Sequence, residues 1–175
     1  SRALTQRIVD RLAPTTVITR DLAVAVPAID GDWLNANWTP EDQRTDTQRE
    51  TLALSDTLIA ELKAADTIVI GAPIYNFGIP ATLKTWVDLI ARAGITFKYS
   101  ETGPQGLLTG KRAIVAITSG GTQVGSEIDF ASGYLRHVLG FIGITDVQFV
   151  AADQLMVDAD ASHAKAEAAL QALAA

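Results

Sequence analysis

Two loops, each directly after an apolar run, carry the residue types best suited to binding chemistry. The first spans residues 73–80, Pro-Ile-Tyr-Asn-Phe-Gly-Ile-Pro, and the second spans residues 118–123, Thr-Ser-Gly-Gly-Thr-Gln. Both contain glycine and lie close to the start of a predicted helix, so their backbone N–H groups can approach a ligand. The aromatic residues of the first loop and the small polar turn of the second would suit the edge of a flat heteroaromatic ring.

An ordinary structural role is the alternative interpretation of these loops. Proline and glycine after a strand are most often turn residues, and the rings of Tyr75 or Phe77 could pack beneath the loop. Composition alone favours this structural role, so the choice depends on the rest of the chain.

Other kinds of site are poorly supported. The dinucleotide fingerprint G-x-G-x-x-G is absent. Gly110 and Lys111 hint at a phosphate loop, but Gln105 and Arg112 stand where that motif requires glycine and serine or threonine. Ser119 lacks the G-x-S-x-G elbow of serine hydrolases. With no cysteine and only two histidines, we expect no disulfide, no thiol nucleophile and no metal site.

Composition limits the classes of protein that remain. A chain of 175 residues that is 48% hydrophobic and 19% charged is expected to fold as one domain spanning residues 1–175. Its net charge of −6 argues against a nucleic-acid partner. No apolar run approaches the roughly 20 residues of a membrane span, so no membrane partner is expected. The absence of cysteine fits a reducing cytoplasm, where we expect the protein to work.

Alternating strand and helix patterns would position the two loops. Strands are predicted at residues 15–20, 67–73, 113–117 and 147–150, and helices at 1–12, 39–62, 80–94, 127–139 and 160–175. Residues 21–37 are expected to form a long polar loop, 95–99 a short strand or structured loop, and 101–110 a loop. Glu127 and Asp129 are interpreted as capping acids. The alternation predicts an α/β fold with a parallel sheet, in which ligands bind beyond the carboxyl ends of the strands.

The chain opens on a helical pattern, although a parallel α/β domain usually begins with a strand. Leu4, Ile8 and Leu12 recur at helical spacing, and Ser1 is placed to cap the helix. We therefore expect a first strand to precede Ser1.

Several long segments resemble the FMN-dependent NADH azoreductases. The flavin loop and following helix of that family are similar to Ala-Pro-Ile-Tyr-Asn-Phe at 72–77 and Ile-Pro-Ala-Thr-Leu-Lys at 79–84. The resemblance continues through residues 88–99, 101–107 and 139–144, and it covers essentially the whole chain.

This resemblance implies a flavodoxin-like three-layer sandwich that works as a homodimer, with FMN at the subunit interface. The residues implied to line the isoalloxazine ring are Pro73, Ile74, Tyr75, Asn76 and Phe77. Those implied to hold its pyrimidine side are Ser119, Gly120 and Gly121, and those implied to shape the substrate pocket are Tyr99 and Phe141. Ser1 would be the last serine of the phosphate-binding loop, most of which would precede it.

The activity implied is a ping-pong transfer of two electrons from NADH or NADPH, through FMN, to a quinone or azo compound. Because the flavin supplies the chemistry, no catalytic acid–base side chain is expected. The alternative is a flavodoxin-type electron carrier without small-molecule turnover. The extended segments 21–37 and 100–109 favour an enclosed pocket at a dimer interface, and therefore the enzyme.

Overall fold

A three-stranded parallel sheet lies at the centre of the computed structural model, which describes residues 1–24 and 26–174. The strand order is β1 (Thr67–Pro73), β4 (Arg112–Thr118) and β5 (Asp146–Ala152). The register pairs Pro73 with Thr118 and Thr118 with Ala152, so the three carboxyl ends are level at one edge of the sheet. The loops that follow all three strands therefore start side by side.

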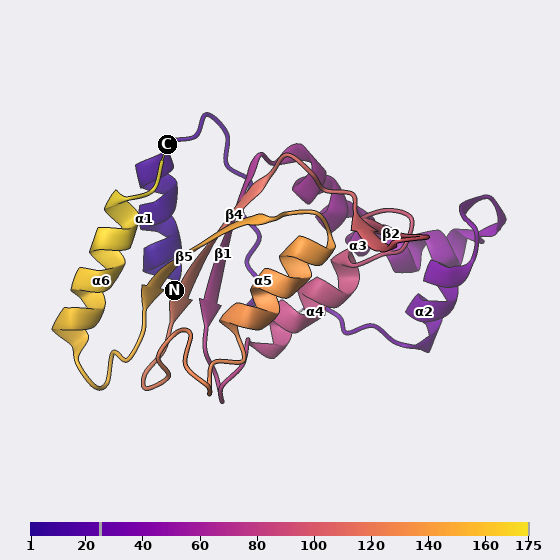
Figure 1. Cartoon of the computed structure of the whole chain (residues 1–175). Helices are drawn as coiled ribbons and strands as arrows, with labels where there is room; N and C mark the ends of the chain where they lie inside the picture. Colours follow the sequence, from indigo (N-terminus) through magenta and orange to yellow (C-terminus); the bar gives the residue numbers. More distant parts are fainter. Residues whose placement is uncertain (25, 175) are drawn as a thin grey trace.

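Helices cover both faces of this sheet (Figure 1). In the described residues the α-helices are α1 (Arg2–Leu12), α2 (Gly31–Trp38), α3 (Asp46–Ala64), α4 (Ala81–Ile90), α5 (Ser132–Phe141) and α6 (Ala159–Gln171). One apolar cluster joins α1 and α6 to one face, and a larger cluster joins α3, α4 and α5 to the other. The prediction of an α/β three-layer sandwich with a parallel sheet is confirmed.

Strand β4 shows why its central residues, 113–117, are all apolar. Ala113, Val115 and Ile117 belong to the larger cluster, whereas Ile114 and Ala116 belong to the smaller one. Successive side chains of a strand point to opposite faces, so a strand covered by helices on both sides buries every residue.

The N-terminal third departs most from the sequence-based predictions. Residues 15–20 are not a strand, and Val17 and Ile18 are exposed. A strand exists only through hydrogen bonds to a neighbour, and the described residues provide this segment with no pairing. The predicted polar loop at 21–37 in fact contains α2, whose first turn is capped by the Asp30 carboxylate accepting from the Trp33 N–H at 2.8 Å.

Four other predicted boundaries shift. The helix expected from Thr39 starts at Asp46, where Thr45 and Gln48 form a reciprocal capping box. The predicted 80–94 helix ends at Ile90, and the predicted helix at 127–139 begins at Ser132. The final helix ends at Gln171, and Ala175 lies outside the described residues.

Capping explains the late start of α5. The Asp129 carboxylate accepts from the N–H groups of Ala131 and Ser132, each at 2.9 Å, so Asp129 acts as the predicted cap. Glu127 makes no such contact in the described residues, and its predicted capping role is wrong.

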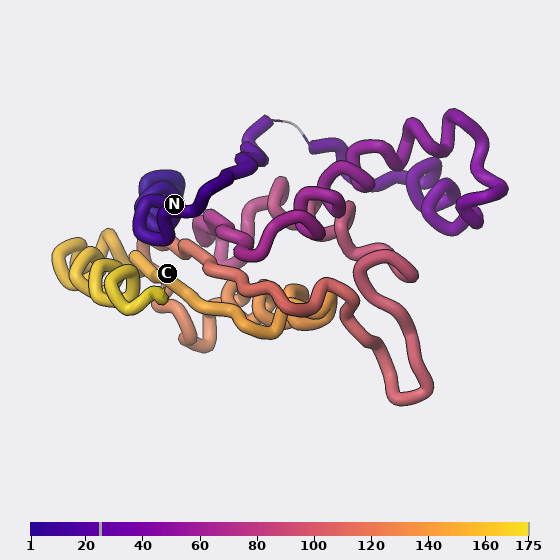
Figure 2. The backbone as a smooth tube through the Cα atoms, turned by 90° about the horizontal axis from the view of Figure 1, so that it is seen from above, coloured from indigo at the N-terminus to yellow at the C-terminus, as the bar shows by residue number. Residues whose placement is uncertain are grey.

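Residues 97–106, expected to form at most one short strand, form a hairpin of β2 (Phe97–Ser100) and β3 (Gly103–Gly106). Figure 2 shows it extending from the body of the molecule, at the same end as α2. At its base the chain crosses the turn after α5. A Cβ atom on Gly106 would lie 2.1 Å from the backbone nitrogen of Gly143, which itself has a φ of +106°. Both crossing positions therefore require glycine.

Candidate functional site

The two predicted loops meet at the carboxyl edge of the sheet. The Ile74 N–H donates to the carbonyl of Thr118 at 2.8 Å, and the Phe130 N–H donates to the carbonyl of Phe77 at 3.1 Å. The first bond holds the start of the first loop against the second loop, and the other holds Phe77 against the segment that precedes α5.

The first loop is a tight turn closed by two hydrogen bonds between Tyr75 and Gly78. Its central residues, Asn76 and Phe77, have φ values of +48° and +72°. Left-handed backbone is unfavourable for residues other than glycine, and it occurs at sites that the surrounding structure enforces. The rings of Tyr75 and Phe77 are 62% and 53% exposed, so neither packs beneath the loop. The purely structural interpretation is therefore wrong for these two rings.

The second loop is held by its own side chains. The Ser119 hydroxyl is buried, donates to the Thr122 carbonyl and accepts from the Gln154 N–H at 3.1 Å. Ser119 therefore shapes the loop from within. Met156 lies over Gly120, and a Cβ on Gly120 would come within 2.9 Å of its sulfur.

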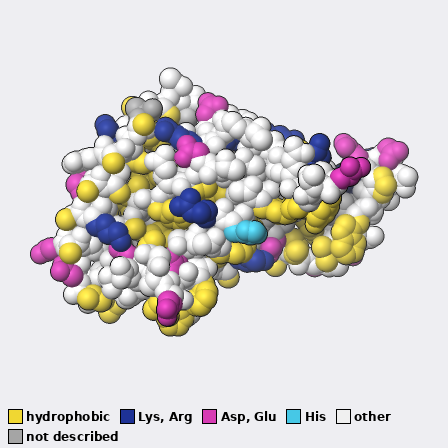
Figure 3. Space-filling view, viewed as in Figure 1, with side chains coloured by type: hydrophobic (Ala, Val, Ile, Leu, Met, Phe, Trp, Pro, Cys, Tyr) yellow, Lys and Arg dark blue, Asp and Glu magenta, His cyan; other side chains and the backbone are white. Residues whose placement is uncertain are grey.

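Main-chain donors remain available at this edge, among them those of four predicted site residues. The hydrogen bonds among the described residues do not use the N–H groups of Asn76, Phe77, Gly120 or Gly121. Such groups can bind the carbonyl oxygens or ring nitrogens of a planar ligand. Hydrophobic side chains are exposed at the lower edge of the molecule as well as elsewhere on the face that Figure 3 shows. The large exposed hydrophobic residues of the first loop are Tyr75 and Phe77, and those of the segment that follows the second loop are Ile128 and Phe130.

A shallow hollow of about 360 Å³ lies beside the second loop, on the side facing the exit of β5. Its lining residues are Gly121, Gln123, Ser126, Glu127, Ile128 and Gln154. Gly121 and Gln123 belong to the second loop that the sequence indicated, whereas no sequence motif pointed to Ser126, Ile128 or Gln154.

Ser1 lies near the same edge. A Cβ on Gly71, two residues before the end of β1, would be 3.6 Å from the Cβ of Ser1. Ser1 precedes α1 as its N-cap, but its hydroxyl does not make the capping bond. The start of a helix with an uncommitted hydroxyl is suited to an anion.

Tyr99 and Phe141 lie together but far from these loops. The ring of Phe97 contacts both, with centroid distances of 5.6 Å to Tyr99 and 4.4 Å to Phe141. Helices α4 and α5 each run back from the carboxyl edge of the sheet. The residues that follow α4 or end α5 therefore lie at the opposite edge, where the strands begin (the amino edge). Figure 1 accordingly shows β2 at the opposite end from the arrowheads of β1 and β4. Within one chain, the structure does not join these rings to the loops.

Comparison with known proteins establishes the family. A family model described as a flavodoxin-like fold matches residues 1–175. An FMN-dependent NADH:quinone oxidoreductase 1 of Jannaschia sp. (strain CCS1) is 67% identical over 175 residues, covering 100% of this chain and 91% of that protein. This chain belongs to the FMN-dependent NADH:quinone oxidoreductase family. Another member, from Cereibacter sphaeroides (strain KD131 / KCTC 12085), is 59% identical over 179 residues, with the same two coverages of 100% and 91%.

Solved structures agree with this family. An azoreductase from Bacillus anthracis str. Sterne has a TM-score of 0.82 and 27% identity, covering 97% of this chain and 85% of that one. An FMN-dependent NADH-azoreductase from Bacillus anthracis str. Ames Ancestor, in complex with FMN, has a TM-score of 0.81 and 28% identity, covering 97% and 87%. The flavodoxin-like fold and the family resemblance predicted from sequence are confirmed.

The carboxyl edge fits the cofactor in the name of this oxidoreductase family. FMN carries a flat ring with carbonyl and nitrogen acceptors, and this edge offers four uncommitted N–H donors beside exposed aromatic rings. FMN also carries a phosphate, and the start of α1 lies near the same edge. Within residues 1–24 and 26–174, no three His, Cys, Asp or Glu side chains converge as a metal site would require. No helix in that part of the chain is long and apolar enough to cross a membrane.

Asp153, which no motif indicated, anchors the second loop in this family member. Its carboxylate is 3% exposed, accepts from the Val124 N–H at 2.7 Å and is paired with Lys165 at 2.9 Å. Burial by itself raises the pKa of Asp153, but the hydrogen bonds from Lys165 and Val124 outweigh the burial and lower that pKa. The ionised carboxylate therefore stabilises the fold.

We expect this anchor to fail in acid. A carboxyl whose pKa is lower in the folded state contributes fully above its unfolded pKa of about 3.9, and the contribution is lost as pH falls through the folded pKa. The thermal midpoint of the protein should therefore drop below about pH 4. In Asp153→Asn, which does not titrate, the midpoint should be lower at neutral pH and should depend less on pH in this window. The thermal midpoints are measured by circular dichroism. If the midpoints of the wild type and of Asp153→Asn depended equally on pH, this role of Asp153 would be contradicted.

Proposed function

We propose that this protein is an FMN-dependent oxidoreductase that transfers two electrons from NADH or NADPH to quinones or azo compounds. The observation that carries the proposal is the alignment of two strand-end loops that present four uncommitted N–H groups beside exposed rings. The 67% identical relative named an FMN-dependent NADH:quinone oxidoreductase supports the same activity.

The proposed FMN site uses each predicted residue in a definite way. Pro73, Ile74 and Tyr75 would line the ring, and the N–H groups of Asn76 and Phe77 would face its polar edge. The N–H groups of Gly120 and Gly121 would hold the pyrimidine side, on a loop whose shape Ser119 maintains. Ser1 and the start of α1 would bind the phosphate. Bound FMN supplies the redox chemistry, and the protein binds it, orients it and excludes water.

We further propose a homodimer whose substrate pockets are shared between chains. Tyr99 and Phe141 lie at the amino edge, whereas the two loops proposed to bind FMN (residues 73–80 and 118–123, the FMN loops) lie at the carboxyl edge of the same chain. A pocket that contains both groups therefore requires the hairpin of one chain to meet the loops of another. The exposed rings on both surfaces, Tyr99 among them at 74% exposure, support such a contact. A cytoplasmic location is proposed because NADH and NADPH are available there.

Steady-state kinetics test the proposed activity. Protein purified with added FMN should show the absorbance of a bound flavin, and it should oxidise NADH in the presence of menadione or an azo dye, with turnover on the order of 10 per second. Double-reciprocal plots at several acceptor concentrations should be parallel, as a ping-pong cycle requires. FMN alone, without protein, is the control. A yellow protein without turnover with NADH or NADPH would instead indicate an electron carrier and contradict the proposal.

A further inference from the structure

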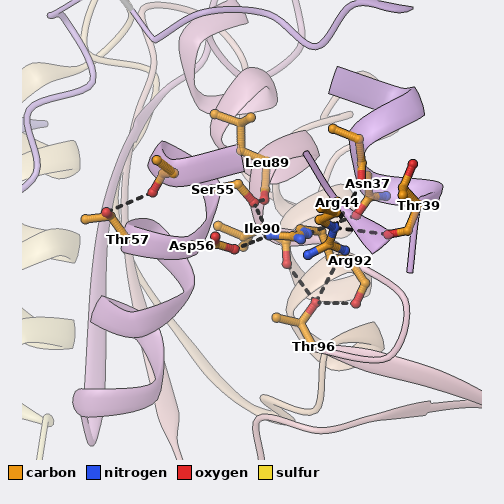
Figure 4. A network of polar contacts seen from close by, with 12 residues as sticks. Asn37, Thr39, Arg44, Ser55, Asp56, Thr57, Leu89, Ile90, Arg92 and Thr96 are labelled. Carbon is orange, nitrogen blue, oxygen red and sulfur yellow. Dashed lines mark hydrogen bonds and ion pairs between the residues drawn. The ribbon is translucent and has the colours of Figure 1, made fainter. Parts of the chain in front are cut away.

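Arg92 is a buried cation that joins three segments (Figure 4). Its side chain is 0% exposed, and it comes two residues after α4 ends. The Nε atom donates to Asn37 at the end of α2 at 2.9 Å, and Nη1 donates to Ser55 at 3.1 Å and to Asp56, both on α3. The remaining nitrogen, Nη2, is buried and has no partner among the described residues.

The main chain of Arg92 forms the root of the hairpin. Its N–H donates to the hydroxyl of Thr96 at 3.0 Å, and that hydroxyl donates to the Ile90 carbonyl at 2.7 Å. The Thr96 N–H donates to the Arg92 carbonyl at 3.0 Å. The next residue, Phe97, begins β2, which carries Tyr99. The conformation of Arg92 therefore determines where the hairpin leaves the body of the protein.

Stability alone is a poor explanation for a charge at this position. The only carboxylate that meets the buried guanidinium within the described residues is Asp56, whose own side chain is 58% exposed. Buried ion pairs are frequently no more stabilising than apolar residues of similar volume. A guanidinium does, however, place its donors in a rigid planar fork, which fixes the directions of several partners at once. The arrangement around Arg92 favours a geometric role.

We propose that Arg92 is a positioning residue for the electron acceptor, an inference that rests on the proposed function. By locking the hairpin root to α2 and α3, Arg92 fixes the direction in which Tyr99 is presented to the FMN loops of a second copy of this chain. Loss of the hydrogen bonds that join Arg92 to α2 and α3 weakens binding of the acceptor. It leaves FMN binding unchanged, because the FMN loops lie at the opposite edge of the sheet.

The test weakens the hydrogen bonds that hold the Arg92 side chain, without removing its buried charge. Asn37→Ala and Asp56→Asn each alter one partner of Arg92, and Asp46→Asn is the matched control because Asp46 pairs with the exposed Arg49 on the same helix. In the FMN-loaded protein, KM for menadione should rise about tenfold in Asn37→Ala and less in Asp56→Asn, with kcat and the FMN dissociation constant within about twofold. Amides 97–106 should exchange hydrogen about tenfold faster, whereas those of β4 should not change. The control should match the wild type.

Three results would overturn the role of Arg92: an unchanged KM, an equal loss of FMN affinity, or faster exchange throughout the protein. Hydrogen exchange and FMN binding are measured without turnover. If the wild type does not reduce menadione, the proposed function fails, and the exchange of amides 97–106 still decides whether Arg92 locks the hairpin. Arg92→Lys adds a further check, because a lysine that keeps the charge without the fork should behave like Asn37→Ala.

Discussion

Replacing Gly106 with alanine is expected to lower the free energy of unfolding by about 3 kcal/mol or more. The new Cβ would lie 2.1 Å from the backbone nitrogen of Gly143 and 2.4 Å from its Cα. A side chain could rotate away, but these are backbone atoms of a turn that is fixed by the Leu108 N–H donating to the Ile142 carbonyl at 2.8 Å. Relief therefore requires the hairpin to move away from α5.

Chemical denaturation by urea measures this loss, and Gly133→Ala is the matched control. Gly133 lies in α5, where an added Cβ meets nothing within 4 Å. Alanine is the better helix former there, so this variant should be as stable as the wild type or more stable by up to about 1 kcal/mol. If Gly106→Ala were as stable as Gly133→Ala, the close crossing of the two chain segments would be refuted.

Mixing two defective variants is expected to restore activity, if each pocket is shared between two chains. Gly121→Asp should prevent FMN binding, because its carboxylate would stand beside the N–H groups that we propose face the flavin. Its Cβ has open space, so the fold should tolerate it. Tyr99→Ala, at an exposed position, should bind FMN but reduce quinone poorly at low quinone concentration. Each variant alone should therefore show little activity under those conditions.

A hybrid dimer regains one complete site. The Tyr99→Ala chain provides intact FMN loops, and the Gly121→Asp chain provides an intact hairpin to the same pocket. Random pairing of equal amounts makes half of the dimers hybrids, so about a quarter of all sites should regain the wild-type KM. The measurement is the quinone reductase rate of a co-refolded mixture. A rate equal to the average of the two separate variants would show that each chain builds its pocket alone.

The central part of the fold could be predicted from local sequence. Strands β1 and β4 each contain a run of at least five apolar residues, and such runs are suited to a parallel sheet buried on both faces. The loops that follow them could be predicted for the same reason, since a strand's carboxyl end determines where its loop begins. Their family resemblance then indicated the ligand.

Features that depend on distant partners could not be predicted from the sequence. Residues 15–20 have the composition of a strand, but pairing decides whether a strand forms. Helix α2 contains weak helix formers, and it owes its place to the Asp30 cap and to the burial of Trp33 and Ala36. These contributions override local propensity.

The candidate site likewise combines loops that could be predicted from local sequence with residues whose roles depend on distant partners. The separation of Tyr99 from the two loops proposed to bind FMN follows from the direction of α4, which no motif encodes. Asp153 and Arg92 are single residues whose side chains bond to partners 12 or more positions away in the chain. Only the three-dimensional arrangement identifies them.

The left-handed turn at Asn76 and Phe77 has a consequence for the speed of cofactor uptake. The unfavourable backbone of this turn is adopted when the protein folds, held by its own two hydrogen bonds and by the contact from Phe130. The apoprotein should therefore already have the loop conformation of the loaded protein, with no ordering entropy left for the moment of binding. Association of FMN should then be a single exponential that accelerates linearly with FMN concentration, without the plateau that a slow loop rearrangement would impose.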